Sequence, residues 1–179
     1  MEKELRYWEN PLIIKENKED GHNNANAYND VKSALEGGDA PYRISLNGTW
    51  KFYWQQDVSV TSTEYFDPDF NDAFWDDMTV PSVWQLNGYG KPIYLCSFFP
   101  KGISTNEKEI PKIDEKINEL GVYRRWFTVP EDWAGKQIFM NFGAVKAGFF
   151  LYINGRKVGY SQGSMTPAEF DITDYVTPG

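Results

Sequence analysis

Aromatic side chains gather in one short run, residues 80–94, which reads V-P-S-V-W-Q-L-N-G-Y-G-K-P-I-Y. Its two prolines fix φ and lack a backbone donor, and the Asn-Gly pair at 87–88 is a turn signal, so the run predicts an ordered loop. Flat aromatic faces with a polar tip suit the C–H faces and hydroxyl edges of a sugar. The alternative is that the rings fill a core, as most buried aromatic side chains do. The rings that this loop presents are those of Trp84, Tyr89 and Tyr94.

Carboxylates at positions 67–72 begin like a calcium-binding loop of the form D-x-D-x-N. The sixth position is Asp72, where such a loop needs glycine for its sharp turn, and the twelfth is Met78, where it needs a bidentate glutamate. The pattern therefore excludes a helix-loop-helix calcium site. A solvated acidic loop is the favoured interpretation, because charge runs are usually solvated.

The chain has one histidine, His22, and one cysteine, Cys96. His22 lies in an asparagine-rich loop and Cys96 has no histidine near it in the sequence, so a serine–histidine or cysteine–histidine mechanism has no support. Cys96 is expected to behave as a small buried apolar side chain. A single cysteine also excludes an internal disulfide and a cysteine-based metal cluster. The charged first residues favour a cytoplasmic location, or a periplasmic one if a signal peptide was removed.

Composition excludes two classes of partner. Lys and Arg number 18 against 26 Asp and Glu, for a net charge of −8, and the sequence has no dense basic run that could track a phosphate backbone, so we expect no nucleic acid. The sequence also has no apolar stretch near the roughly 20 residues that cross a bilayer, so we expect no membrane span.

The elements that must position these side chains are mostly short strands with turns between them, which is typical of a β-sandwich or jelly roll. The Asn-Gly pair at 154–155 is the clearest hairpin signal. Residues 1–45 are expected to form an extended arm with one short helix near 29–35, and residues 46–179 the sandwich. Strands are expected at 50–54, 122–129, 137–142, 149–153 and 157–160.

Two further helical features are expected. Ile113, Ile117 and Leu120 share one helical face, which predicts a short inserted helix over 110–120 that ends at Gly121. The four-residue spacing of Phe66, Phe70 and Phe74 predicts a helical turn that packs one aromatic face.

Seven blocks of the sequence form an ordered set. One is the loop at 80–94, through its V-P-S-V-W-Q and P-I-Y. The others are Y-W-E-N-P at 7–11, S-L-N-G-T-W-K-F at 45–52, F-D-P-D-F-N-D-A-F-W at 66–75, G-V-Y-R-R-W-F at 121–127, I-N-G-R-K-V-G-Y-S at 153–161 and E-F-D-I at 169–172. Taken in order, these blocks resemble the glycoside hydrolase family 2 β-galactosidases. The resemblance covers nearly the whole chain.

This resemblance implies an all-β, galactose-binding-like jelly roll that lacks its last strands, which in the family follow the position of Gly179. It also implies that the parent enzyme hydrolyses terminal β-D-galactosides by a retaining mechanism. The two catalytic glutamates lie in a (β/α)₈ barrel downstream, so no catalytic residue is expected in this chain. Mg²⁺ and Na⁺ are implied for the parent, with no cofactor in this chain. The implied partners are a β-galactoside, the remaining domains and further copies of the protein.

One position departs from the family pattern. Family members usually carry an asparagine two residues after the P-I-Y motif, where it reaches into the galactose subsite. Here Cys96 stands at that position, and a thiol replaces an amide poorly. The expected edge of the substrate pocket is Trp84, Tyr89, Tyr94 and Cys96. Three alternatives remain open: a free-standing carbohydrate-binding module, a structural jelly roll that mediates subunit contacts, and the equivalent domain of a β-glucuronidase or β-mannosidase.

Overall fold

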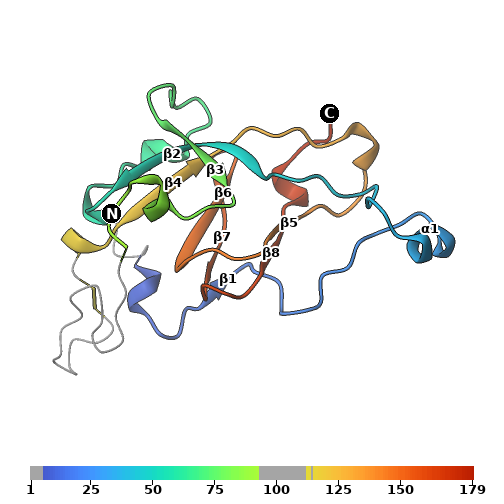
Figure 1. The fold of residues 1–179 in the computed structure, drawn as a ribbon, viewed down its shortest axis with the longest axis horizontal. Helices are drawn as coiled ribbons and strands as arrows, with labels where there is room; N and C mark the ends of the chain where they lie inside the picture. The colour runs from blue at the N-terminus through green and yellow to red at the C-terminus, as the bar shows by residue number, and fades with distance from the viewer. Residues whose placement is uncertain (1–5, 93–111, 114) are drawn as a thin grey trace.

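The computed structural model describes residues 6–92, 112–113 and 115–179. Within these ranges the chain forms short antiparallel strands, one α-helix and several single turns of 3-10 helix (Figure 1). The predicted all-β class is therefore confirmed.

Strand β1 (Lys15–Glu16) pairs with β7 (Arg156–Gln162), which pairs with β6 (Gly148–Ile153). The second sheet has the order β3 (Asp76–Val80), β2 (Gly48–Gln55), β4 (Leu120–Arg124), and the third pairs β5 (Phe139–Phe142) with β8 (Ala168–Asp171).

The main core lies between the β5–β8 pair and the β6–β7 hairpin. Burial alternates along β8, where Ala168 and Phe170 are buried and Glu169 lies on the other face, as the two-residue period of a strand requires. The Phe170 ring meets Phe142 and Phe149 nearly edge-on. The buried members of this core are Val129, Ile138, Met140, Ile153, Val158, Ala168, Phe170 and Ile172.

The β6–β7 hairpin turns at Asn154-Gly155, as the sequence predicts. Both residues have positive φ, 50° and 77°, and the flanking residues Ile153 and Arg156 are paired. Two consecutive left-handed residues match the right-handed twist of the strands that they join. The prediction of this hairpin is confirmed.

The predicted helix near 29–35 is also confirmed, as α1 (Val31–Glu36). The Asp30 side chain accepts from Ser33 N and the Ser33 hydroxyl accepts from Asp30 N, which is a capping box. Figure 1 shows α1 at one end of the molecule, away from the β2–β3–β4 sheet.

The predicted helix over 110–120 is wrong in the part that the structure describes. Glu115–Ile117 form one turn of 3-10 helix, and Leu120 begins strand β4, opposite Gln55. Gly121 pairs with Trp54 within that strand instead of ending a helix. Pairing with a strand about 65 residues away overrides the local helical period, because the ladder satisfies these backbone groups.

The predicted helical turn with one aromatic face is wrong as well. Phe66 stacks on Tyr152 of β6, with ring centroids 3.9 Å apart. Phe70 packs against Trp75, whereas Phe74 is 73% exposed. The three phenylalanines therefore do not share one face: Phe70 and Phe74 contact each other, with ring centroids 6.3 Å apart, whereas Phe66 packs on β6. The 3-10 turn Thr63–Phe66 ends before Phe70, so no helical turn aligns the three rings.

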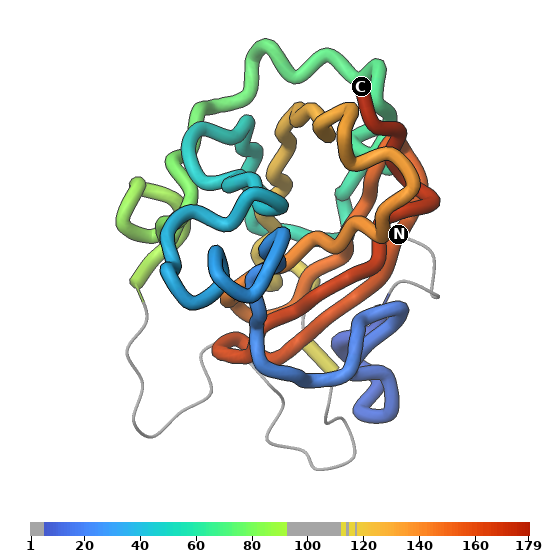
Figure 2. Tube along the Cα trace, turned by 90° about the vertical axis from the view of Figure 1, so that its right-hand side faces the viewer, coloured from blue at the N-terminus to red at the C-terminus, as the bar shows by residue number. Residues whose placement is uncertain are grey.

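Part of the N-terminal arm belongs to the first sheet. Lys15 and Glu16 of β1 pair with Ser161 and Tyr160 of β7, and the Asn17 side chain donates to the carbonyl of Val158 at 2.8 Å. Figure 2 shows the arm, in blue, crossing beside the red strands of the C-terminal half. The boundary between an arm and a sandwich at residues 45 and 46 stays a prediction.

Candidate functional site

Trp84 is held against the β2–β3–β4 sheet by the 3-10 turn Trp84–Asn87, which follows β3. Its ring lies directly over Gly121 of β4: a Cβ added to Gly121 would stand 2.6 Å from Trp84 Cε3 and 2.9 Å from Phe52 Cε2. Only glycine leaves room for this approach. The indole Nε1 is buried and has no hydrogen-bond partner among the residues that the structure describes. Trp84 therefore packs inward.

Tyr89 also packs inward. Its ring meets Phe52 edge-on at 4.9 Å, and its hydroxyl donates to Asp76 Oδ2 at 2.6 Å. This hydrogen bond to a carboxylate, aided by desolvation, raises the pKa of Tyr89 to about 12. Tyr123 completes the group at 4.7 Å from Phe52, which is fully buried. We call these four residues the Phe52 cluster: Phe52, Trp84, Tyr89 and Tyr123.

The loop orders itself around this cluster through short-range hydrogen bonds. Ser82 Oγ donates to the carbonyl of Thr79 at 2.6 Å, and Asn87 Nδ2 donates to the carbonyl of Val83 at 3.0 Å. The turn closes at Gly88, whose φ of 91° suits glycine. Its most exposed apolar side chain is Leu86, which is 81% exposed, and Val83 is exposed as well. The ordered loop is as predicted, but an aliphatic side chain occupies its outer face.

The predicted pocket edge thus divides into two parts. Trp84 and Tyr89 lie together and pack inward, which agrees with the alternative interpretation that the rings fill a core. Tyr94 and Cys96 lie outside the described residues. That the four residues line a sugar pocket stays a prediction.

Arg124 organises the acidic loop at 65–72. Its Nε donates to Asp72 Oδ2 at 2.9 Å, and its Nη1 donates to the carbonyls of Tyr65 and Asp67 at 2.6 and 3.0 Å. A guanidinium has five donors in a rigid fork, so one side chain can close a whole loop. In the sequence, this arginine stands out only as part of the G-V-Y-R-R-W-F block. One feature of the sequence could have indicated this role: a pair of arginines at the end of a strand, with an acidic loop upstream.

The same loop was the carboxylate run that resembled a metal site. Asp72 is paired with Arg124, and the Asp67 carboxylate accepts from the backbone of Asp69 at 2.9 Å. In the part of the chain that the structure describes, no group of three or more His, Cys, Asp or Glu side chains is placed to hold a metal ion. These residues therefore supply no cluster of carboxylates for the ions that the resemblance implies for the parent.

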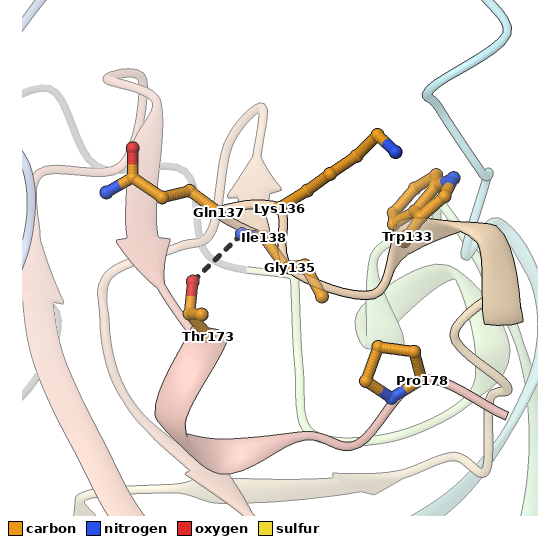
Figure 3. A pocket seen from close by; sticks show the side chains of 7 residues that line it. All are labelled: Trp133, Gly135, Lys136, Gln137, Ile138, Thr173 and Pro178. Carbon is orange, nitrogen blue, oxygen red and sulfur yellow. Dashed lines mark hydrogen bonds between the residues drawn. The ribbon is translucent and has the colours of Figure 1, made fainter.

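The surface of the described residues includes two hollows of appreciable volume. One, of about 320 Å³, lies between residues 133–138 and the C-terminal segment (Figure 3). Its Thr173 hydroxyl is already engaged, accepting from Ile138 N at 2.9 Å and donating to Asp171 Oδ1 at 2.5 Å. The other, of about 740 Å³, lies between the arm and the ends of β7 and β8. Neither hollow is lined by Trp84 or Tyr89.

Among the described residues, no helix combines the length and the apolar character that a bilayer crossing requires.

A family comparison decides the membership of the chain. Residues 44–179 match the model of the glycosyl hydrolases family 2 sugar binding domain. The chain belongs to glycosyl hydrolase family 2. Two similar family 2 proteins named beta-galactosidase come from Priestia megaterium, 37% identical over 172 residues, and Photobacterium profundum, 39% identical over 174 residues. These alignments cover 95% and 97% of this chain but 16% of each relative.

Solved family 2 structures support the fold. The chain superposes on a beta-glucuronidase from an uncultured Clostridium with a TM-score of 0.51 and 25% identity, over 75% of this chain and 20% of that one. For a Ruminococcus gnavus beta-glucuronidase the TM-score is 0.52 and the identity 23%, over 79% and 20% of the two chains. The family resemblance inferred from the sequence blocks is confirmed.

Proposed function

We propose that this chain is the N-terminal sugar-binding domain of a β-galactosidase. One observation carries the proposal: nearly the whole chain matches proteins named beta-galactosidase, while spanning about a sixth of their length. Hydrolysis of terminal β-D-galactosides, by a retaining two-glutamate mechanism, then belongs to the parent protein and to residues outside this chain. The partners of the domain are a β-galactoside, the other domains of the parent and further copies of it. Its proposed location is the cytoplasm.

Contacts among the described carboxylates support a scaffold role for the domain. Asp72 holds Arg124, Asp76 accepts from Tyr89, and Glu16 pairs with Lys157. Each of these groups ties together segments that are far apart in the sequence or belong to different elements. These contacts give each of the three carboxylates a structural role within the domain.

The test compares the 179-residue chain with the full-length protein from the same gene, using nitrophenyl β-galactoside and β-glucuronide as substrates. We expect turnover only by the full-length protein, and a higher kcat/KM for the galactoside. Turnover by the short chain that disappears when one of its own acidic residues is changed would overturn the proposal.

A second candidate, a β-glucuronidase domain, is favoured by the solved structures at 25% identity. A higher kcat/KM for the glucuronide would establish that candidate instead.

Cys96 offers a separate test of the proposed pocket edge. The resemblance places a sugar-contacting asparagine at this position, and an amide supplies two donors and an acceptor that a thiol lacks. In the full-length protein, Cys96→Asn should lower KM for the galactoside, whereas Cys96→Ser, of similar size to the thiol, should not. Equal KM values for the two variants would remove Cys96 from the pocket edge and leave the domain assignment untouched.

A further inference from the structure

The arm forms one wall of the 740 Å³ groove, and the ends of the C-terminal strands form the other. Residues 14–24 of the arm face the loop that follows β7 and the first residues of β8. Just beyond β1, Glu19 N donates to the carbonyl of Glu169 in β8 at 2.9 Å. The arm therefore leaves the first sheet at β1 and crosses to the third sheet, where His22 makes its contacts.

His22 lies between two groups that can only accept hydrogen bonds. Its Nδ1 is 2.8 Å from the carbonyl oxygen of Asp20, within the arm. Its Nε2 is 3.0 Å from Glu169 Oε1, on β8. A neutral imidazole has one N–H and can satisfy one of these acceptors, whereas an imidazolium has two and satisfies both. Both contacts can therefore be hydrogen bonds at the same time only when the ring is protonated.

Glu169 is held in place for this contact. Its other oxygen, Oε2, accepts from Asn141 Nδ2 of the neighbouring strand β5 at 3.2 Å. The same Asn141 amide donates to Asn24 Oδ1 of the arm at 3.2 Å. His22 and Asn24 thus meet β8 and β5 side by side.

Charged groups around His22 come from the arm and from β8. Glu169 faces it from β8, and Glu19 adds a more distant negative charge from the arm. The Asp20 carboxylate is paired with Lys15, so its charge is offset, and Lys18 also lines the groove. From β5 the facing group is the uncharged Asn141. The hydrogen bond to the Asp20 carbonyl, followed by the charge of Glu169, raises the pKa of His22 above the ordinary histidine value.

We propose that His22 is a pH-dependent clamp that holds residues 18–24 of the arm across the groove while its ring is protonated. Loss of the proton removes one of its two hydrogen bonds and its attraction to Glu169, so this stretch loosens and the groove widens. Upstream, the arm is held by the ion pair of Glu16 with Lys157 and by the backbone pairing of β1 with β7, and neither involves His22. The release is therefore confined to the residues that follow β1.

The sign of the pH dependence follows from the raised pKa of His22 in the folded chain. The stability that His22 gives to the closed arm is complete at pH values below the ordinary histidine pKa, and it is lost as the pH rises through the raised value. The His22 and Glu169 side chains remain 48% and 21% exposed, so solvent weakens their attraction. We expect about a twofold to fivefold change in the opening equilibrium of residues 18–24, which is the range that exposed ion pairs support.

The experiment uses the fact that His22 is the only histidine. A proton–carbon NMR titration of the native chain gives one imidazole signal, which needs no assignment by mutation. Hydrogen exchange across residues 18–24, expressed as protection relative to the unstructured rate at each pH, reports the opening. We expect the titration above the ordinary histidine value, and protection that falls about twofold to fivefold through the same pH range.

Three variants separate the clamp from general loosening of the arm. Glu169→Gln should move the His22 titration down toward the ordinary value, and His22→Gln should abolish the pH dependence of protection. Glu16→Gln is the matched control: it should weaken arm protection without changing its pH dependence. A His22 titration at or below the ordinary value in the native chain, or an unchanged pH dependence in His22→Gln, would overturn the proposal. These readouts do not depend on which sugar the parent hydrolyses.

Discussion

The ring edge of Phe170 lies across Gly159: a Cβ added to Gly159 would stand 2.8 Å from Phe170 Cε1. The backbone oxygen of Glu16 in β1 crowds the same point. Gly159 is therefore the position at which the core and the arm strand both approach the middle of β7. A side chain at this position would have to displace one of them.

Gly159→Ala should destabilise the chain by about 1–3 kcal/mol, the usual result of overpacking a well-packed site. The measurement is chemical denaturation monitored by tryptophan fluorescence. Gly143→Ala is the matched control, because a Cβ at Gly143 has no atom within 4 Å. If both variants unfold at the same denaturant concentration as the native chain, the close approach at Gly159 has no energetic consequence.

Lys157 of β7 contacts the N-terminal arm through several of its residues. Its Nζ is 2.5 Å from Glu16 Oε2 and 3.1 Å from the Tyr7 hydroxyl, and it stands 4.5 Å from the Tyr7 ring centroid. Lys157→Met keeps the aliphatic stem but removes the charge. We expect the opening of residues 7–17 to become easier by about 1–2 kcal/mol, the size of one partly desolvated cation–π contact, measured by hydrogen exchange.

The control for Lys157 is Lys32→Met on α1, where the lysine pairs with Glu36 at 3.8 Å and both side chains are largely exposed. That variant should leave the arm unchanged. Equal exchange in residues 7–17 of Lys157→Met and the native chain would show that β1–β7 backbone pairing alone retains the arm.

Tyr89 should make the chain sensitive to alkali. Its folded pKa, raised to about 12, lies above the ordinary tyrosine value of about 10. The hydrogen bond to Asp76 therefore stabilises the fold fully below pH 10, and this contribution is lost as the pH rises from about 10 toward 12. The measurement is the unfolding midpoint at a series of alkaline pH values.

Tyr89→Phe isolates this effect, since the other tyrosines are common to both chains. The variant should be less stable than the native chain at pH 8 and should lose less stability between pH 10 and 12. Two parallel alkaline profiles would contradict the assignment of the Tyr89 hydroxyl to Asp76.

An open backbone edge follows β4. Gly179 N donates to Val129 O at 3.0 Å, but residues 126–128 make no backbone hydrogen bond to any other described residue. Trp126 is 71% exposed there. Unpaired backbone groups beside an exposed ring favour pairing with a strand of another molecule. We expect the 179-residue chain to dimerise with rising concentration in light scattering.

Trp126→Lys should keep the chain monomeric, because a charge on a segment with unpaired backbone groups opposes its pairing with another chain. Leu35→Lys, which changes an 83% exposed leucine on α1, should dimerise like the native chain. A native chain that stays monomeric over the whole concentration series would refute the edge as an association site.

Local signals in the sequence were sufficient for several elements. The Asn154-Gly155 turn and the α1 cap at Asp30 depend on the φ preferences or side-chain hydrogen bonds of adjacent residues. The β2 strand is dense in β-formers, and the ordered loop at 81–90 carries its own turn residues. The blocks in order also established the family. These features require no knowledge of distant residues.

Tertiary structure alone decided where the side chains of those elements point. Leu120 and Gly121 became strand because β2 offers them a ladder, and the absence of a side chain at Gly121 allows Trp84 to pack inward. The partnership of His22 with Glu169 joins residues almost 150 positions apart. Periodicity along the chain describes one element at a time. Burial, ion pairing and the direction of a ring depend on which distant segment packs against it, and that is set only when the whole chain has folded.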